Sequence, residues 1–299
     1  MKNNFDSINI IKTIFKWKWH IIIITVIAAI LGVVFSSSFF IKPKFKSTAV
    51  LYPHNMSMIS TESKTEQMLQ IINSDDIKFM VIDENSLDIH YEVDRNSQNY
   101  LRDIFSEYDG KVSIKKTPND AVQITVLDID PNMACRIVES IINNYNNFSW
   151  KSFTGIQTNL LDIYTKAYEE NELEMKKLAE DLTMMRVNYN LLDLKSQIKF
   201  STNKNLLENW EKRGAEYQKI DSLYNSYIHM QSENLQNIKS IKREIITKRN
   251  FCRVISNPFP ASTKSTPVRW LIVLLSILGA FFTSSIVAVF FDIFKENNI

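Results

Sequence analysis

Two long apolar runs, one near each end of the chain, constrain the fold more than any other feature. Residues 21–41 and residues 270–291 contain no Asp, Glu, Lys or Arg. At a rise of about 1.5 Å per residue, either run is long enough as a helix to cross the apolar core of a bilayer. Trp17 and Trp19 before the first run, and Trp270 at the start of the second, are typical of membrane interfaces. The sequence therefore predicts two transmembrane helices.

A cleaved signal peptide is the alternative interpretation of the first run. The apolar region of a signal is usually about 7–15 residues long and ends at a small-residue cleavage site. This run is longer and continues directly into Phe39, Phe40 and Ile41, which favours an uncleaved anchor. Because lysines crowd the N-terminal side of the first run, we expect residues 1–20 and 292–299 to be cytoplasmic. The central segment is also basic near both membrane ends, but it is too long to count in the positive-inside rule. These lysines and arginines are Lys2, Lys12, Lys16 and Lys18 at the N-terminus, and Lys42, Lys44, Lys46, Arg249, Arg253, Lys264 and Arg269 in the central segment.

Small residues recur four apart inside both predicted spans, and such stripes let helix backbones approach closely in lipid. The sequence therefore predicts close packing of the two spans, within one chain or between chains. Ordinary small-residue content is the plainer alternative. The residues concerned are Ala28 and Gly32 in the first span, and Ser276, Ala280, Ser284 and Ala288 in the second, with Gly279 beside them.

Residues 42–130 predict a small α/β unit close to the membrane. Thr117 to Asp120 is a hairpin-turn signal between two of its strands. β-rich segments predict strands at 46–52, 111–115 and 122–127, and helices are expected at 64–73 and 76–85, with a polar loop at 56–61.

Residues 131–257 predict a long antiparallel helical hairpin. Asp130 suits the N-cap and Pro131 the first helical position, and no further proline occurs before residue 258. Residues 188–190 weaken helix propensity and mark the expected reversal, giving arms at 131–187 and 194–250. Pro258, Pro260, Pro267 and Arg269 then predict an extended elbow, residues 258–269, into the second span. The arms carry an apolar repeat with steps of mostly three and four, which includes Met175, Leu178, Leu182, Met185, Tyr189, Leu206, Trp210, Tyr217, Ile220 and Tyr224.

The sequence offers no pattern of catalytic chemistry. Only five glycines occur, which argues against phosphate-cradling loops, and the four histidines are dispersed. Cys135 and Cys252 have no metal-ligand spacing, and we interpret them as unpaired thiols rather than as a disulfide. The net charge of +2 does not suggest a nucleic-acid partner. Residues 292–299 are too few for an enzyme domain, so we expect no enzyme activity, no cofactor, no metal and no catalytic residue.

The order of these parts resembles the Wzz-type chain length determinants, or polysaccharide co-polymerases. Residues 45–51, Phe-Lys-Ser-Thr-Ala-Val-Leu, are similar to the family's Y/F-x-S-x-A-x-L entry strand. Residues 128–134, Asp-Ile-Asp-Pro-Asn-Met-Ala, look like its D-P-x-x-A helix start. The elbow prolines and Gly279 also fall where the family has prolines and glycines. The resemblance covers nearly the whole chain.

This resemblance implies an α+β membrane protein in which two transmembrane helices flank a periplasmic domain with a small α/β base and a long antiparallel helical hairpin. It implies a homo-oligomeric ring in the bacterial inner membrane that sets the chain length of O-antigen, capsule or exopolysaccharide. The implied partners are a Wzy-type polymerase, the growing polysaccharide and a separate tyrosine kinase. A periplasmic export adaptor is the main alternative, although two spans and few glycines weigh against it. A sensor would need a signalling domain that residues 292–299 cannot supply.

Overall fold

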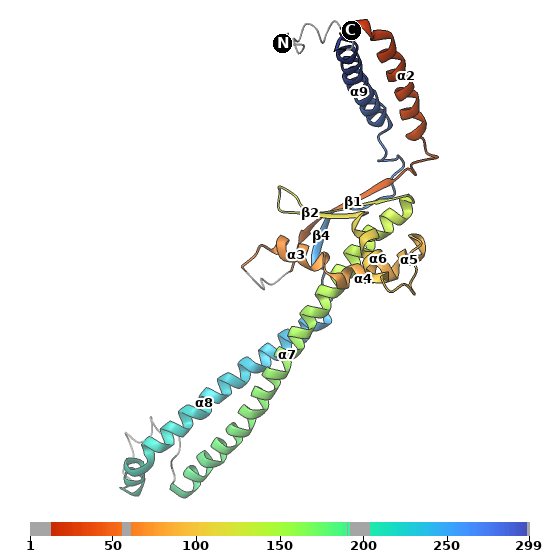
Figure 1. The fold of residues 1–299 in the computed structure, drawn as a ribbon. Helices are drawn as coiled ribbons and strands as arrows, with labels where there is room; N and C mark the ends of the chain where they lie inside the picture. The colour runs from red at the N-terminus through yellow and green to blue at the C-terminus, as the bar shows by residue number, and fades with distance from the viewer. Residues whose placement is uncertain (1–12, 56–60, 190, 192–203, 298–299) are drawn as a thin grey trace. The chain divides into compact units, whose positions relative to one another are not determined.

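The computed structural model describes residues 13–55, 61–189, 191 and 204–297 (Figure 1). It divides into two compact units, Met1–Tyr145 with Cys252–Ile299, and Asn146–Phe251. The first unit combines helices with a small sheet, and the second is helical. Most of the predicted loop at 56–61, and part of the predicted reversal at 188–190, lie outside the described residues.

Helices α2 (Lys18–Phe35) and α9 (Arg269–Asn297) are both long and apolar enough to cross a membrane, by length and composition. Helix α2 ends six residues before the predicted end at residue 41, and turns follow it. Three consecutive serines begin at Ser36, whose Oγ donates to the Val33 carbonyl oxygen at 3.2 Å. Serine hydroxyls of this kind compete with the backbone ladder, which explains the early end of the helix.

The sheet of the first unit has four antiparallel strands in the order β2-β3-β1-β4. Strands β1 (Phe45–Pro53), β2 (Val112–Lys116) and β3 (Val122–Asp128) lie where the sequence predicts strands. Alternate residues of β1 and β3 are buried, as a sheet with one covered face requires. Strand β4 (Cys252–Ser256) is different, because it occupies residues that the sequence assigns to the helical hairpin. That boundary is wrong: β4 pairs with β1 across a long stretch of chain, which local sequence does not show.

Four short helices belong to the same unit: α3 (Lys64–Ile72), α4 (Asp75–Glu84), α5 (Leu87–His90) and α6 (Tyr100–Asp109). The first two are the predicted ones, and α5 and α6 are additional. Helix α3 contacts β1, β2 and β3, and α6 contacts α4 and β2. The core that they form includes the fully buried side chains of Leu51, Met68, Ile72, Ile77, Ile82, Leu87, Ile104, Tyr108 and Ile124.

Helix α7 (Pro131–Tyr189) begins at the predicted residue. The backbone N–H of Asn132 donates to Asp130 Oδ1 at 2.9 Å, so Asp130 caps the helix as expected. The first turns of α7 belong to the first unit, where Ala134, Ile137, Val138, Ile141 and Tyr145 are buried. Proline suits the first helical position because the N–H that it lacks would have had no partner within the helix.

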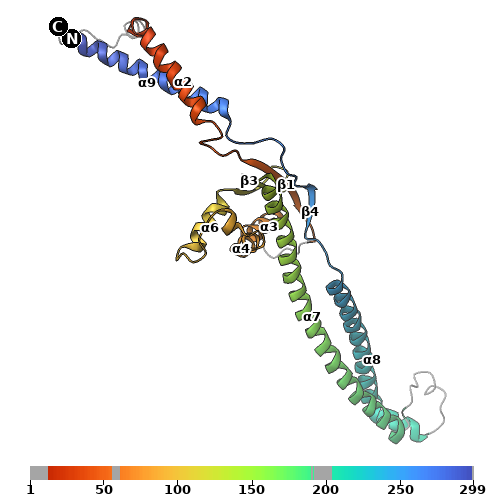
Figure 2. The same cartoon turned by 90° about the vertical axis from the view of Figure 1, so that its right-hand side faces the viewer.

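The second unit consists of the remainder of α7 and of α8 (Lys204–Ile246), which lie side by side in both views (Figures 1 and 2). Lys248 Nζ donates to Asn147 Oδ1 at 3.4 Å, and Arg186 Nε donates to the Tyr217 hydroxyl at 3.1 Å. The helices are therefore antiparallel. Members of the predicted apolar repeat form the core near the far end: Leu182, Met185 and Tyr217 with Leu191, against which Tyr189, Trp210, Ile220 and Tyr224 pack.

Candidate functional site

The two apolar helices pack against each other in antiparallel fashion. The Trp17 and Phe291 rings are 6.5 Å apart at one end, and Arg269 Nη2 donates to Ser38 Oγ at 2.8 Å at the other. Near the end that carries Ser38 and Arg269, a Cβ added to Gly32 would overlap the Ser276 hydroxyl, so the two backbones approach closely there. Packing within one chain, one of the two alternatives left by the sequence, is therefore present.

The predicted small residues do not all lie in this contact. Ser284 and Ala288 are buried, and Ala28 and Ala280 are half-buried. Gly279 is exposed, and a Cβ added to it would meet no atom within 4 Å. The stripe thus divides into residues that hold α2 against α9 and a glycine that faces away.

An ion pair lies at one end of the contact between α2 and α9. Lys16 Nζ donates to Asp292 Oδ1 at 2.6 Å, and the Thr13 hydroxyl donates to Oδ2 of the same carboxylate at 3.0 Å. Beside this ion pair, a hollow of about 340 Å³ lies between the two helices, and its lining is mostly apolar. Its lining comprises Trp17, His20, Ile21, Ile24, Thr283, Ser284, Val287, Ala288 and Phe291.

The predicted elbow is irregular chain between β4 and α9, and it runs beside the segment that joins α2 to β1. Lys44 forms a β-bridge with Thr266, in which Lys44 N donates to the Thr266 carbonyl at 2.9 Å. The Ser47 hydroxyl donates to the Phe259 carbonyl at 3.2 Å. Pro258, Pro260 and Pro267 all lie in this elbow, and none of them directly follows the long helix. Helix α8 already ends at Ile246, and β4 stands between it and the prolines.

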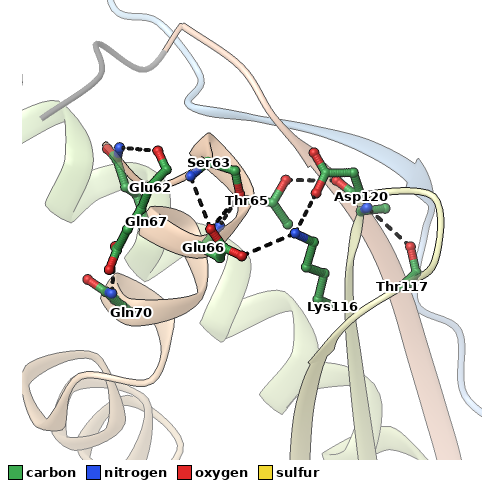
Figure 3. A network of polar contacts seen from close by, with 10 residues as sticks. Glu62, Ser63, Thr65, Glu66, Gln67, Gln70, Lys116, Thr117 and Asp120 are labelled. Carbon is green, nitrogen blue, oxygen red and sulfur yellow. Dashed lines mark hydrogen bonds and ion pairs between the residues drawn. The ribbon is translucent and has the colours of Figure 1, made fainter. Parts of the chain in front are cut away.

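A polar network joins α3 to the turn between β2 and β3 (Figure 3). Ser63 and Glu66 form a capping box, and Lys116 Nζ lies 3.3 Å from Glu66 Oε1 and 2.9 Å from Asp120 Oδ1. The hydrogen bonds from Ser63, and then Lys116, lower the pKa of Glu66. The buried Thr65 hydroxyl donates to the Asp120 carbonyl at 2.7 Å. Since each polar group here has a partner within the network, its role is to fasten the turn to the helix.

A buried carboxylate lies where β3 leads into α7. Asp128 is 1% exposed; His90 Nε2 lies 2.8 Å from its Oδ1, and the Tyr91 hydroxyl donates to its Oδ2 at 3.0 Å. The backbone N–H of Asp130 also donates to Oδ1, at 2.9 Å. Burial, and next the Asp128 charge, raise the pKa of Tyr91. In the sequence, Asp128 stands out only as the first residue of the segment 128–134, and nothing local indicates that His90 and Tyr91 would meet it.

The described residues hold no group of three or more His, Cys, Asp and Glu side chains placed to bind a metal. Cys135 and Cys252 are both buried, and neither forms a disulfide among the described residues. Burial is the main cause that raises the pKa of Cys135. The features that remain as candidates for function are therefore the contact of the two apolar helices and the elbow beside it.

Part of the sequence matches a known protein family. Residues 3–85 match the sequence model of the family described as chain length determinant protein, Wzz. In the structure this matched segment contains α2, β1, α3 and α4. The resemblance stated from the sequence is confirmed over these residues.

Solved structures of polysaccharide co-polymerases are also similar to this chain. One, described as a full-length bacterial polysaccharide co-polymerase, is 13% identical, covers 98% of this chain and 99% of its own, and has a TM-score of 0.45. A fragment of WzzB from Salmonella Typhimurium is 12% identical, with coverages of 75% and 100% and a TM-score of 0.35. The wild-type Shigella flexneri O-antigen chain-length regulator WzzBSF is 11% identical, with coverages of 74% and 100% and a TM-score of 0.30. No curated protein matches the chain.

Proposed function

We propose that this chain is a non-enzymatic regulator of the chain length of a bacterial surface polysaccharide, anchored in the inner membrane. The observation that carries the proposal is the match of residues 3–85 to the chain length determinant family. The two apolar helices that flank the sheet domain support the membrane anchor. O-antigen, capsule and exopolysaccharide are all polymers to which such a regulator would apply.

The antiparallel contact of α2 with α9 supports the proposed topology. Lys16, just before α2, lies against Asp292 of α9, and the domain follows from the opposite ends of the two helices. Lys12, Lys16 and Lys18 favour a cytoplasmic position for the chain ends. The central domain would then be periplasmic, where the polymer is extended.

An exposed apolar stripe on α7 supports assembly of several copies. Ile156, Leu160 and Ile163 follow one another by four and three residues, and they are 55%, 37% and 59% exposed. An unpaired apolar face on a helix is unfavourable in water, and another helix can cover it. The proposed occupant is a second copy of this chain in a homo-oligomeric ring.

The proposed ring would act on a Wzy-type polymerase through the membrane helices. Gly279 leaves open space on the outer face of α9, where a helix of the polymerase could approach closely. The growing polysaccharide and a separate tyrosine kinase are further proposed partners. No catalytic residue is assigned in this proposal.

The test is a deletion of the gene followed by complementation, with the polymer resolved by length on a gel. Loss of the protein should leave polymer that lacks its preferred length, and the intact chain should restore it. An unchanged profile in the deletion strain would contradict the proposal. For topology, a reporter active only in the periplasm should work when fused at Asn190 and fail when fused after Ile299.

A further inference from the structure

Basic residues gather where the two apolar helices meet the sheet domain, and the proposed function does not use them. Residues 36–47, which follow α2, contain Lys42, Lys44 and Lys46, and residues 257–270, which lead into α9, contain Lys264 and Arg269. Neither segment contains any Asp or Glu. In a chain whose net charge is only +2, this is a strong local excess of positive charge.

The structure brings these two segments together, although more than 200 residues separate them in sequence. Lys44 bridges Thr266, and Ser265 N donates to the Lys44 carbonyl at 2.8 Å, which places Lys264 next to this bridge. The hydrogen bond from Arg269 to Ser38 holds the other end of the pair of segments. We call the group of Lys42, Lys44, Lys264 and Arg269 the basic junction.

The charges of the basic junction have no acidic partner among the residues that the structure describes. Lys42, Lys264 and Arg269 are exposed and Lys44 is half-buried. Across the described ranges of the chain, none of these four residues forms an ion pair, whereas Lys16 at the other end of the helices pairs with Asp292. Four cations close together repel one another, so an anion that bound between them would be stabilised.

The surroundings of the basic junction are those of a membrane surface. Phe39, Phe259 and Trp270 are 89%, 65% and 68% exposed, and Phe39 and Trp270 lie beside the ends of the apolar helices. Of these three, Trp270 is the kind of side chain that prefers the headgroup level of a bilayer. Helix α9 also starts at Arg269, and its first free backbone N–H groups add a favourable potential for an anion.

We propose that the basic junction binds the phosphate of an anionic lipid headgroup in the leaflet that faces the sheet domain. The inference rests on the proposed membrane anchoring, because only a spanning chain places these residues at a bilayer surface. Arg269 suits a phosphate because its planar guanidinium can donate two hydrogen bonds at once. The exposed aromatic residues favour a lipid over a soluble phosphate ester or an acidic polysaccharide, since they would contact the apolar part of the bilayer.

The experiment uses the full chain in micelles of a neutral detergent and a phosphatidylglycerol that carries a photoreactive group in its headgroup. After irradiation, cross-linked peptides are identified by mass spectrometry as the lipid concentration is raised. Cross-links should appear in residues 38–46 and 259–270. In the variant K42Q/K44Q/K264Q, half-maximal cross-linking there should need roughly a hundredfold more lipid, or about fivefold for each lost charge.

Two variants separate charge from other effects. The variant K42R/K44R/K264R keeps the charge and should bind as the native chain does. The matched control K204Q/K219Q/K239Q removes three exposed lysines of α8 and should leave cross-linking at the basic junction unchanged. Cross-links to the N-terminal lysines serve as an internal reference in every sample.

Several outcomes would overturn the proposal. One is equal cross-linking of a phosphatidylcholine with the same reactive group, and another is a K42Q/K44Q/K264Q variant that binds like the native chain. Displacement of the lipid by an equal concentration of inorganic diphosphate, or by an acidic oligosaccharide, would show that the junction does not select a lipid. Polymer length in cells is measured separately, so either the lipid site or the proposed regulatory function can fail without the other.

Discussion

Gly32 of α2 lies directly against Ser276 of α9, and a Cβ at Gly32 would overlap the Ser276 hydroxyl and approach Ser276 Cβ to 3.3 Å and Val273 Cα to 3.5 Å. The close approach of the two helices thus depends on the absence of a side chain at one position. In lipid, where apolar surface gives little driving force between helices, such packing supplies much of the attraction.

We expect G32L to separate the two helices and to destabilise the chain by about 1–3 kcal/mol, because a large side chain is forced into a packed contact. The measurement is the thermal unfolding of the full chain in detergent. G279L is the matched control, since Gly279 has open space around it on the same helix pair. Equal destabilisation by both variants would contradict the packing described here.

The same control has its own expected effect in cells. If the face of α9 at Gly279 meets another protein, G279L should broaden or shorten the polymer length distribution while the variant is present at normal levels and unfolds normally. The measurement is a gel profile of the polymer beside an immunoblot of the protein. A normal profile would remove this face from the proposed contact with the polymerase.

The half-buried Tyr91 and the buried Tyr108 should respond differently to the same substitution. The Tyr91 hydroxyl donates to Asp128, so Y91F should destabilise the domain by about 2 kcal/mol, the value of a hydrogen bond to a charged acceptor. The Tyr108 hydroxyl is buried and has no hydrogen-bond partner among the described residues, so Y108F should be neutral or stabilise by about 1 kcal/mol. Thermal unfolding of each variant decides the matter, and the same sign for both would refute it.

Stability should also fall at alkaline pH. Burial raises the pKa of both Tyr91 and Tyr108 above the ordinary value of 10.0. Above that pH the tyrosines of the unfolded chain ionise while the folded ones stay neutral, so the unfolded state is favoured. The contribution is complete below pH 10 and is lost as the pH rises beyond it. The double variant Y91F/Y108F should flatten this part of a stability profile, and an unchanged slope would contradict the assignment.

The glycines of the helical hairpin offer a further matched pair. Gly155 in α7 has no atom within 4 Å of an added Cβ, so G155A should stabilise the helix by about 1 kcal/mol. At Gly214 in α8 the added Cβ would lie 2.9 Å from two ring atoms of Trp210, so G214A should bring no gain. Thermal unfolding is again the measurement. A gain at Gly214 as large as at Gly155 would show that the Trp210 ring can move aside.

Elements specified by local pattern could be predicted from the sequence. β-rich composition identified β1 and β3, and the Asp130-Pro131 cap identified the start of α7. Helix α6 was missed even though Tyr100, Ile104 and Tyr108 follow one another by four, and Ile104 and Tyr108 are buried in the core. That signal was available in the sequence. The helix is short and its other positions are mostly polar, so its stability depends on packing against α4 and β2.

Features that depend on distant partners could not be predicted in the same way. Strand β4 has five residues and no breaker before it, so the absence of proline suggested a longer helix. Its actual conformation is stabilised by hydrogen bonds to β1. The meeting of Asp128 with His90 and Tyr91 likewise depends on how α5 lies against the sheet. The small residues of the second span were recognised, but which of them face α2 depends on the register between the helices.

The pairing of β4 with β1 has a consequence for the order of folding. Val50 pairs with Ser256, so one edge of β1 stays open until almost the whole domain has been synthesised. At roughly 5–20 residues per second, the intervening chain of about 200 residues takes on the order of 10–40 s to make. During that time the open edge can pair with other strands, including those of neighbouring nascent chains. A long hairpin placed between two strands of one sheet therefore makes completion of the sheet a late event.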